Sequence, residues 1–93
     1  MKLSGVVWLP EIVEKIDRKH GVAVEEVEEA LANRPRFRKL ERGRIDGEDV
    51  YAAYSRTHEG RYLTIILIRK LDRRALIVTA RDMDRKERRQ YGS

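Results

Sequence analysis

The sequence predicts one α+β domain over residues 1–93, a length that suffices for a single modest core. Apolar residues recur at helical spacing in the first third, and aliphatic runs separated by short turns fill the second half. The short connections between these runs favour antiparallel pairing. We therefore expect the order β-α-α-β-β-β-(β)-α, with a mainly antiparallel sheet packed by two N-terminal helices and one C-terminal helix.

The residue pattern of the N-terminal third predicts a short strand and two helices. An apolar run over residues 4–9 precedes Pro10, which suits the first turn of a helix because its fixed φ is already helical. Gly21 should end that helix in the left-handed conformation. The second helix, over 23–33, has aliphatic residues on one face and glutamates on the other, as expected for a helix packed on a sheet. It begins at Ala23, which has no side-chain oxygen for an N-cap and should cost about 1 kcal/mol of helix stability.

Four strands and a helix complete the predicted chain. Pro35 ends the second helix, so residues 36–41 are expected to form an irregular edge strand. The remaining strands are expected over residues 49–57, 61–69 and 74–80. Asp84 and Glu87 have the spacing of a capping box, which predicts that the last helix begins at Asp84 or one turn earlier at Asp82.

The charge is distributed unevenly along the chain. Lysine and arginine number 21 against 16 aspartates and glutamates, for a net charge of +5. Residues 1–33 carry four basic and seven acidic residues, whereas residues 34–93 carry 17 basic and nine acidic. A positive field favours anionic partners, so contact with a polyanion is expected from the second half. A solvated surface of mixed charge is the alternative.

Several classes are disfavoured by composition. The chain has no cysteine, so neither a disulfide nor a thiolate metal site is expected. No cluster of histidine, aspartate and glutamate has metal-ligand spacing, and we expect no metal and no other cofactor. No apolar run approaches the roughly 20 residues of a membrane span, and no signal peptide opens the sequence. A cytoplasmic protein without membrane contact is expected.

Two arginines are the first candidates for phosphate binding. Arg81 follows the aliphatic strand and precedes an arginine-rich helix, and Arg61 begins the neighbouring strand. A guanidinium presents five donors in a planar fork that matches phosphate. We expect Arg81 and Arg61 to form one pocket that stabilises the transition state of phosphodiester cleavage. For both residues, a salt bridge to an acidic neighbour is the alternative.

Lys19 and His20 are the candidates for acid–base catalysis. Histidine exchanges protons near neutral pH, whereas Lys19 would need cationic neighbours to give up its proton there. His20 could instead cover the C-terminus of its helix, where the dipole favours a cation. Glu48 could hold an arginine or act as a base, or be plain surface.

The last helix supplies further candidates for RNA binding. Met83, Glu87 and Tyr91 lie near one line of this helix, and that line should face the sheet. Arg85 and Arg88, with Arg56 from an earlier strand, could follow an RNA backbone, and Tyr91 could stack on a base. Contact with an acidic protein partner is the alternative for the cations, and core packing is the alternative for each tyrosine.

A series of short motifs spans nearly the whole chain in a fixed order: Trp8, Lys19-His20-Gly21-Val22, Val24-Glu25-Glu26, Gly47-Glu48 with Tyr51, Gly60-Arg61 with Leu63, and Ile77-Val78-Thr79-Ala80-Arg81 with Glu87-Arg88 and Tyr91. In order and spacing the series resembles the BrnT toxins of bacterial type II toxin–antitoxin systems. The resemblance implies a RelE-like fold and a metal-independent endoribonuclease that cleaves mRNA, free or on the ribosome, and inhibits translation. It also implies neutralisation by a DNA-binding antitoxin of ribbon-helix-helix type, through which alone the toxin would meet operator DNA.

The chain departs from the family pattern at three positions: Ala23 replaces the small polar residue common before the second helix, and the other two departures bear on phosphate binding. Val50 and Leu76 stand where the family usually has arginines, so two phosphate-binding groups are missing. Arg56, Arg69 or Arg74 could replace them. The expected function is a toxin ribonuclease with catalysis by Arg81, Arg61, Lys19 and His20. The alternative is a catalytically inactive RNA- or protein-binding module on the same scaffold.

Overall fold

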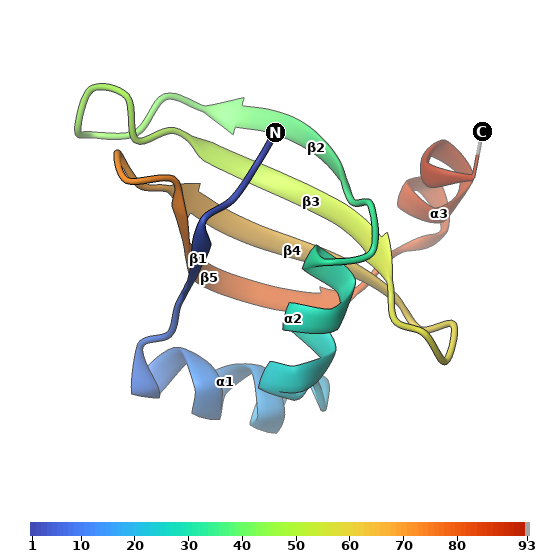
Figure 1. Cartoon of the computed structure of the whole chain (residues 1–93). Coiled ribbons are helices and arrows are strands. Elements are labelled where there is room, and N and C mark those ends of the chain that lie inside the picture. The colour runs from blue at the N-terminus through green and yellow to red at the C-terminus, as the bar shows by residue number, and fades with distance from the viewer. Residues whose placement is uncertain (93) are drawn as a thin grey trace.

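Five strands form one mixed sheet, and three helices pack around it in the computed structural model, which describes residues 1–92 (Figure 1). The elements are β1 (Gly5–Val7), α1 (Pro10–His20), α2 (Val24–Leu31), β2 (Arg36–Glu41), β3 (Val50–Arg56), β4 (Tyr62–Arg69), β5 (Arg74–Asp82) and α3 (Arg85–Tyr91). The sheet order is β1-β5-β4-β3-β2; β1 pairs with β5 in parallel, and the other pairs are antiparallel. The predicted α+β class is confirmed.

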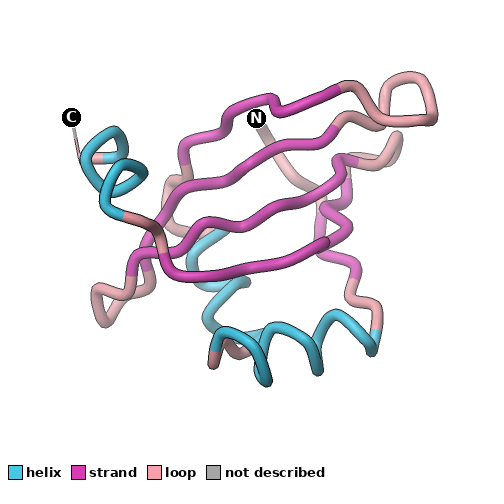
Figure 2. The backbone as a smooth tube through the Cα atoms, turned by 180° about the vertical axis from the view of Figure 1, so that it is seen from behind, coloured by secondary structure: helices cyan, strands magenta, loops and turns pink. Residues whose placement is uncertain are grey.

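Helices α1 and α2 cover one face of the sheet, which we call the helix face (Figures 1 and 2). The other face, called the open face, is contacted near one end by α3. The core lies between the sheet and the first two helices and consists of Ile16, Val22, Val27, Ala30, Ala53, Leu63, Ile65, Leu67, Ala75, Ile77 and Ala80. Burying these side chains is the main source of stability, at about 25 cal/mol for each Å² of apolar surface removed from water.

Side chains alternate between the two faces along each strand. In β4 the core residues Leu63 and Ile65 point to the helix face, whereas Thr64 and Ile66 point to the open face. The cross-strand register carries this alternation into β5, where Leu63 pairs with Asp82 and Thr64 pairs with Arg81. Arg81 and Asp82 therefore project from opposite faces.

The predicted helix boundaries are confirmed where a specific residue sets them. Helix α1 ends at Gly21, which has φ 59° and donates its N–H to the carbonyl of Asp17. Helix α3 begins after Asp84, whose side chain accepts from the N–H of Glu87 at 2.8 Å while Glu87 accepts from the N–H of Asp84 at 2.9 Å. At α2, Ala23 supplies no side-chain cap, but the carboxylate of Glu26 accepts its N–H at 3.0 Å.

Strand β5 continues two residues beyond its predicted end. Arg81 and Asp82 remain paired with β4, so Arg81 lies inside the strand and not in a connection to the helix. No helix in residues 1–92 is long and apolar enough to cross a bilayer.

Candidate nucleic-acid interface

A row of side chains crosses the open face near α3. Arg36 of β2 pairs with Tyr54 of β3, Tyr54 with Thr64 of β4, and Thr64 with Arg81 of β5. Neighbouring strands are about 4.8 Å apart, so four positions in register span roughly 14 Å. The row joins cationic, aromatic and hydroxyl side chains across the face.

Arg81 is held in this row by Glu87 of α3. Its Nη1 and Nη2 donate to Oε1 and Oε2 of Glu87 at 2.7 and 2.9 Å, and the buried Thr64 hydroxyl donates to Oε1 at 3.0 Å. The hydrogen bonds from Arg81, with those from the Asp84 N–H and Thr64, lower the pKa of Glu87 from 4.5 to about 2, against the effect of burial. The Arg81 side chain remains 36% exposed. This ion pair holds α3 against the sheet. The side of α3 that carries Glu87 therefore faces the sheet, as predicted.

Arg61 makes a separate, internal set of bonds on the helix face. Its Nε and Nη2 donate to the carboxylate of Asp82 at 2.7 and 3.2 Å, and its Nη1 donates to Glu26 at 3.1 Å. The remaining donors reach the backbone carbonyls of Gly21 and His20 at 2.8 and 2.9 Å. All three guanidinium nitrogens are thus bound within the fold, and Arg61 ties the α1–α2 junction to the sheet.

The pocket expected from Arg61 and Arg81 together is not formed. Arg81 turns to α3 on the open face, and Arg61 turns to Asp82 and α2 on the helix face. The reason is the alternation of strand side chains, since Arg81 and Asp82, the partner of Arg61, are consecutive residues of β5 and point to opposite faces. The alternative stated for each residue, an ion pair with an acidic neighbour, is confirmed.

Lys19 and His20 also belong to the helix side of the molecule. They lie in the last turn of α1, which carries three basic side chains at the negative end of the helix dipole. Lys19 is exposed, and the His20 carbonyl accepts from Arg61. The structure therefore does not bring Lys19 or His20 together with Arg81.

The open face does gather other candidates around Tyr62, in a group we call the arginine–tyrosine cluster (Arg36, Arg56, Tyr62, Arg88 and Tyr91). The Arg88 Cζ lies 4.0 Å from the centroid of the Tyr62 ring, and the Arg36 Cζ lies 5.9 Å from that of Tyr91. The two tyrosine rings meet edge to face, with centroids 5.9 Å apart and planes at 80°. Hydrogen bonds from Arg56 and then Arg88 lower the pKa of the Tyr62 phenol, although desolvation opposes them.

Three of the four predicted RNA-binding residues lie in this cluster, and Arg85 lies outside it, exposed at the start of α3. Sequence reasoning missed Arg36 as a site residue, and for Tyr62 it preferred core packing to stacking on a base. The signal for Tyr62 is the hairpin of β3 and β4, because its pairing places Arg56 directly opposite Tyr62.

Val50 and Leu76, the two positions without the expected arginines, lie on either side of Ile68 on the open face. Val50 pairs with Ile68, and Ile68 pairs with Leu76, which makes an apolar row at the end of the sheet away from α3. Of the proposed replacements for the missing arginines, Arg74 is bound to Asp72 at 2.7 Å and the Nε of Arg69 is buried. Only Arg56 joins a group of cations, in the arginine–tyrosine cluster.

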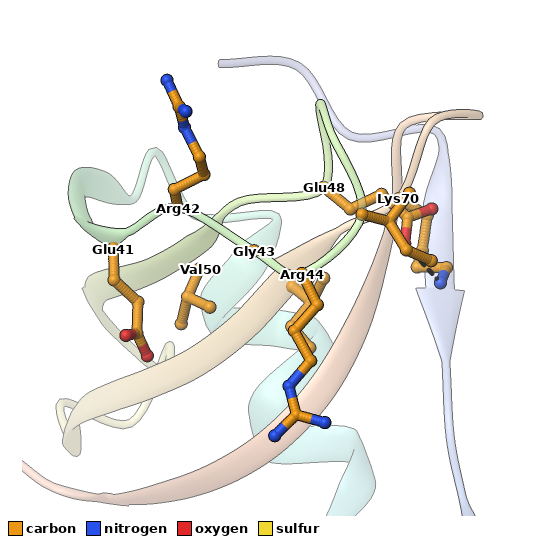
Figure 3. A pocket seen from close by; sticks show the side chains of 9 residues that line it. Glu41, Arg42, Gly43, Arg44, Glu48, Val50 and Lys70 are labelled. Carbon is orange, nitrogen blue, oxygen red and sulfur yellow. Dashed lines mark hydrogen bonds and ion pairs between the residues drawn. The ribbon is translucent and has the colours of Figure 1, made fainter.

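A pocket of about 460 Å³ adjoins this apolar row (Figure 3). Its lining residues are Glu41, Arg42, Gly43, Arg44, Ile45, Glu48, Val50, Ile68 and Lys70. Figure 3 shows Arg42 directed away from the sheet, and Glu41 and Arg44 extended the opposite way.

Glu48 has a structural role in the wall of this pocket. It is 7% exposed and accepts from Lys70 Nζ at 2.8 Å and from the Leu71 N–H at 3.3 Å, which lowers its pKa. Glu48 is therefore neither plain surface nor the partner of an arginine. Gly43 is required here because a Cβ would lie 1.5 Å from the carbonyl oxygen of Glu48.

The described residues contain no group of three or more histidine, cysteine, aspartate or glutamate side chains that could hold a metal ion. In comparisons with known proteins, no family model matches the sequence, and no curated protein matches it.

Proposed function

We propose that the chain binds single-stranded RNA across the open face and cleaves it as a metal-independent toxin endoribonuclease on a RelE-like scaffold. The observation that carries the proposal is the arginine–tyrosine cluster. It combines cations for the phosphate backbone with aromatic rings for the bases, which is the combination that single-stranded nucleic acid requires. The resemblance to BrnT toxins supports the same function independently of the geometry.

Whether an arginine can bind a phosphate depends on whether a carboxylate of the protein already binds it. Within residues 1–92, neither Arg56 nor Arg88 forms an ion pair with a carboxylate. Arg61 and Arg81 are both occupied by carboxylates. A phosphate can approach Arg56 and Arg88 without displacing an internal anion, so these residues are the proposed phosphate clamp. Arg81 supports the clamp from the adjoining row.

Charge also favours the open face over the helix face. Residues 10–31, which include α1 and α2, carry three basic and seven acidic residues. Helix α3, by contrast, has four basic residues and one acidic residue. RNA approaching the molecule is repelled by one side and attracted to the other, at ranges set by the Debye length of about 8 Å in physiological salt.

The proposed protein partner is an antitoxin of ribbon-helix-helix type that neutralises the toxin and binds operator DNA. An acidic segment of such a partner would satisfy the same cations that bind RNA. Occupation of the open face by this segment would then exclude RNA directly.

The test is a binding and cleavage assay on the purified protein with single-stranded RNA. The double variant Arg56→Ala/Arg88→Ala should bind more weakly, and its salt dependence, d log K/d log[salt], should fall in magnitude by about 1.4, which is about 0.7 for each phosphate that the variant no longer binds to a single strand. Arg18→Ala, which removes an exposed arginine of α1, is the matched control and should leave both quantities unchanged. Equal binding by the double variant and the wild type would contradict the proposal.

A catalytically inactive RNA-binding module on this scaffold is the second candidate. It is favoured by one observation, namely that Arg61 and Arg81 both lie in internal ion pairs. Cleavage distinguishes the two candidates: the module binds RNA through Arg56 and Arg88 but leaves the chain intact, and its induced expression does not arrest growth.

A further inference from the structure

We propose that Tyr62 is the general base of this site, whose phenolate takes the 2′-hydroxyl proton of an RNA strand held by Arg56 and Arg88. The inference rests on the proposed ribonuclease function and assigns its proton acceptor. Tyr62 would then be a catalytic residue, since its oxygen touches the reacting hydroxyl.

The position of Tyr62 is fixed from three sides. It begins β4 opposite Arg56, its ring lies under the guanidinium of Arg88, and the edge contact with Tyr91 limits its rotation. The ring is half-buried, and the side chains of Arg56 and Arg88 lie close enough to the phenol to lower its pKa. A phosphate bound by these two arginines is therefore within reach of the phenol oxygen.

The electrostatics of the cluster favour the phenolate. Two guanidinium groups stabilise the negative charge, which is why the pKa of Tyr62 lies below its ordinary value. Arginine has no acceptor and cannot take a proton itself. The cluster thus places a proton acceptor directly beside its phosphate-binding donors.

Neither Glu87 nor a histidine is placed to serve as the base beside Arg56 and Arg88. Glu87 accepts hydrogen bonds from Arg81, Thr64 and the Asp84 N–H, and with a pKa of about 2 it has little affinity for a proton. Both histidines lie on the helix side: His20 ends α1, and His58 donates its backbone N–H to Glu29 of α2. Tyr54 and Tyr91 also lie on the open face, but Tyr62 is the tyrosine that lies beside both Arg56 and Arg88.

The step balances without a co-reactant. The 2′-hydroxyl proton moves to Tyr62 Oη as the 2′-oxygen bonds to phosphorus, and the bond from phosphorus to the 5′-oxygen breaks. Arg56 and Arg88 stabilise the charge that develops on the non-bridging oxygens. The 5′-oxygen takes a proton from water, and Tyr62 later returns its proton to solvent. The products are a 2′,3′-cyclic phosphate and a 5′-hydroxyl end.

The experiment compares Tyr62→Phe with the wild type, and with Tyr51→Phe as a control because Tyr51 packs against the core on the helix face. Cleavage rates are measured from about pH 6 to pH 10, RNA binding is measured by fluorescence anisotropy, and thermal melting checks the fold. Tyr62→Phe should retain binding and lose cleavage by about a hundredfold or more, whereas Tyr51→Phe should match the wild type.

The pH profile supplies a readout that a merely structural role would not move. A base is active when deprotonated, so the wild-type rate should rise tenfold per pH unit and level off at the phenol pKa found by NMR titration of Tyr62. Replacing the tyrosines with 3-fluorotyrosine, which lowers the phenol pKa without removing the ring, should move the plateau to lower pH. This second measurement decides the matter if Tyr62→Phe fails to fold.

The possible results distinguish a failure of Tyr62 as the base from a failure of the ribonuclease function. Cleavage that survives in Tyr62→Phe, or a plateau that 3-fluorotyrosine does not move, overturns Tyr62 as the base and leaves the ribonuclease function standing. Absence of cleavage by the wild type at every pH overturns both.

Discussion

The two faces of the sheet use the same residue type in opposite ways. On the helix face, Arg61 is surrounded by carboxylates and carbonyl oxygens, which consume its hydrogen-bonding capacity. On the open face, Arg56 and Arg88 contact a tyrosine and no carboxylate within the described chain. An aromatic ring orients a guanidinium without neutralising it, so it leaves the charge available to a ligand. The partner of an arginine therefore distinguishes a structural role from a binding role.

Arg81 lies between these two cases. It is on the open face, but Glu87 binds it with two short hydrogen bonds. Its first role is to anchor α3, and α3 in turn carries Arg88 and Tyr91 into the cluster. Arg81 is therefore a positioning residue for the proposed phosphate clamp.

The largest effect on stability is expected from Arg61→Ala. The substitution leaves Asp82, Glu26 and two backbone carbonyls without their donor, and should lower the free energy of unfolding by about 2 to 3 kcal/mol. Urea unfolding measures the loss. Arg18→Ala removes only an exposed pair with Glu14, and should cost about 0.3 to 0.5 kcal/mol. Equal costs for the two variants would remove the structural role assigned to Arg61.

A smaller, pH-dependent effect is expected from Glu87→Gln. The folded-state pKa of Glu87 is lowered to about 2, so its contribution is complete above the unfolded value of 4.5 and is lost as pH falls towards 2. With allowance for solvent at the exposed side of Arg81, the contribution is on the order of 1 to 2 kcal/mol. Unfolding free energies at neutral and acid pH should converge between Glu87→Gln and the wild type as the pH falls. A constant difference across that window would contradict the assignment.

The smallest effect on stability is expected from Arg88→Ala, a substitution that should weaken RNA binding strongly. Arg88→Ala removes a cation that has no carboxylate partner within residues 1–92, and should change the free energy of unfolding by less than about 0.5 kcal/mol. RNA binding should weaken in the same variant. A variant that unfolds readily would show that Arg88 holds α3 in place and would weaken the contrast between the faces.

Local signals in the sequence predicted much of the fold. Gly21 and Asp84 mark helix boundaries through their own backbone and side-chain chemistry, and both predictions are confirmed. The end of β5 was missed because it depends on pairing with β4, which continues to Asp82. The conformational preference of a single residue does not show where such pairing ends.

The site was harder to predict because it depends on which face each side chain occupies. Arg61 and Arg81 lie near one another in the predicted topology, yet their partners are on opposite faces. The pairing of β4 with β5 is irregular between Ile66 and Leu67, whose partners are Thr79 and Ile77. This irregularity changes which residues of β5 point to each face of the sheet, and no residue pattern in the sequence predicts it. The association of Tyr62 with Arg88 depends further on how α3 docks.

Strand β2 forms one rim of the sheet, with a partner on only one side. Five of its six residues are exposed, and three of them, Arg36, Arg38 and Lys39, are cations. An unpaired strand edge is a template for pairing with another chain, and lysine and arginine on that edge oppose it through like-charge repulsion. Two molecules that met rim to rim would bring these cations close together, so the basic character of this rim opposes self-association into extended sheets.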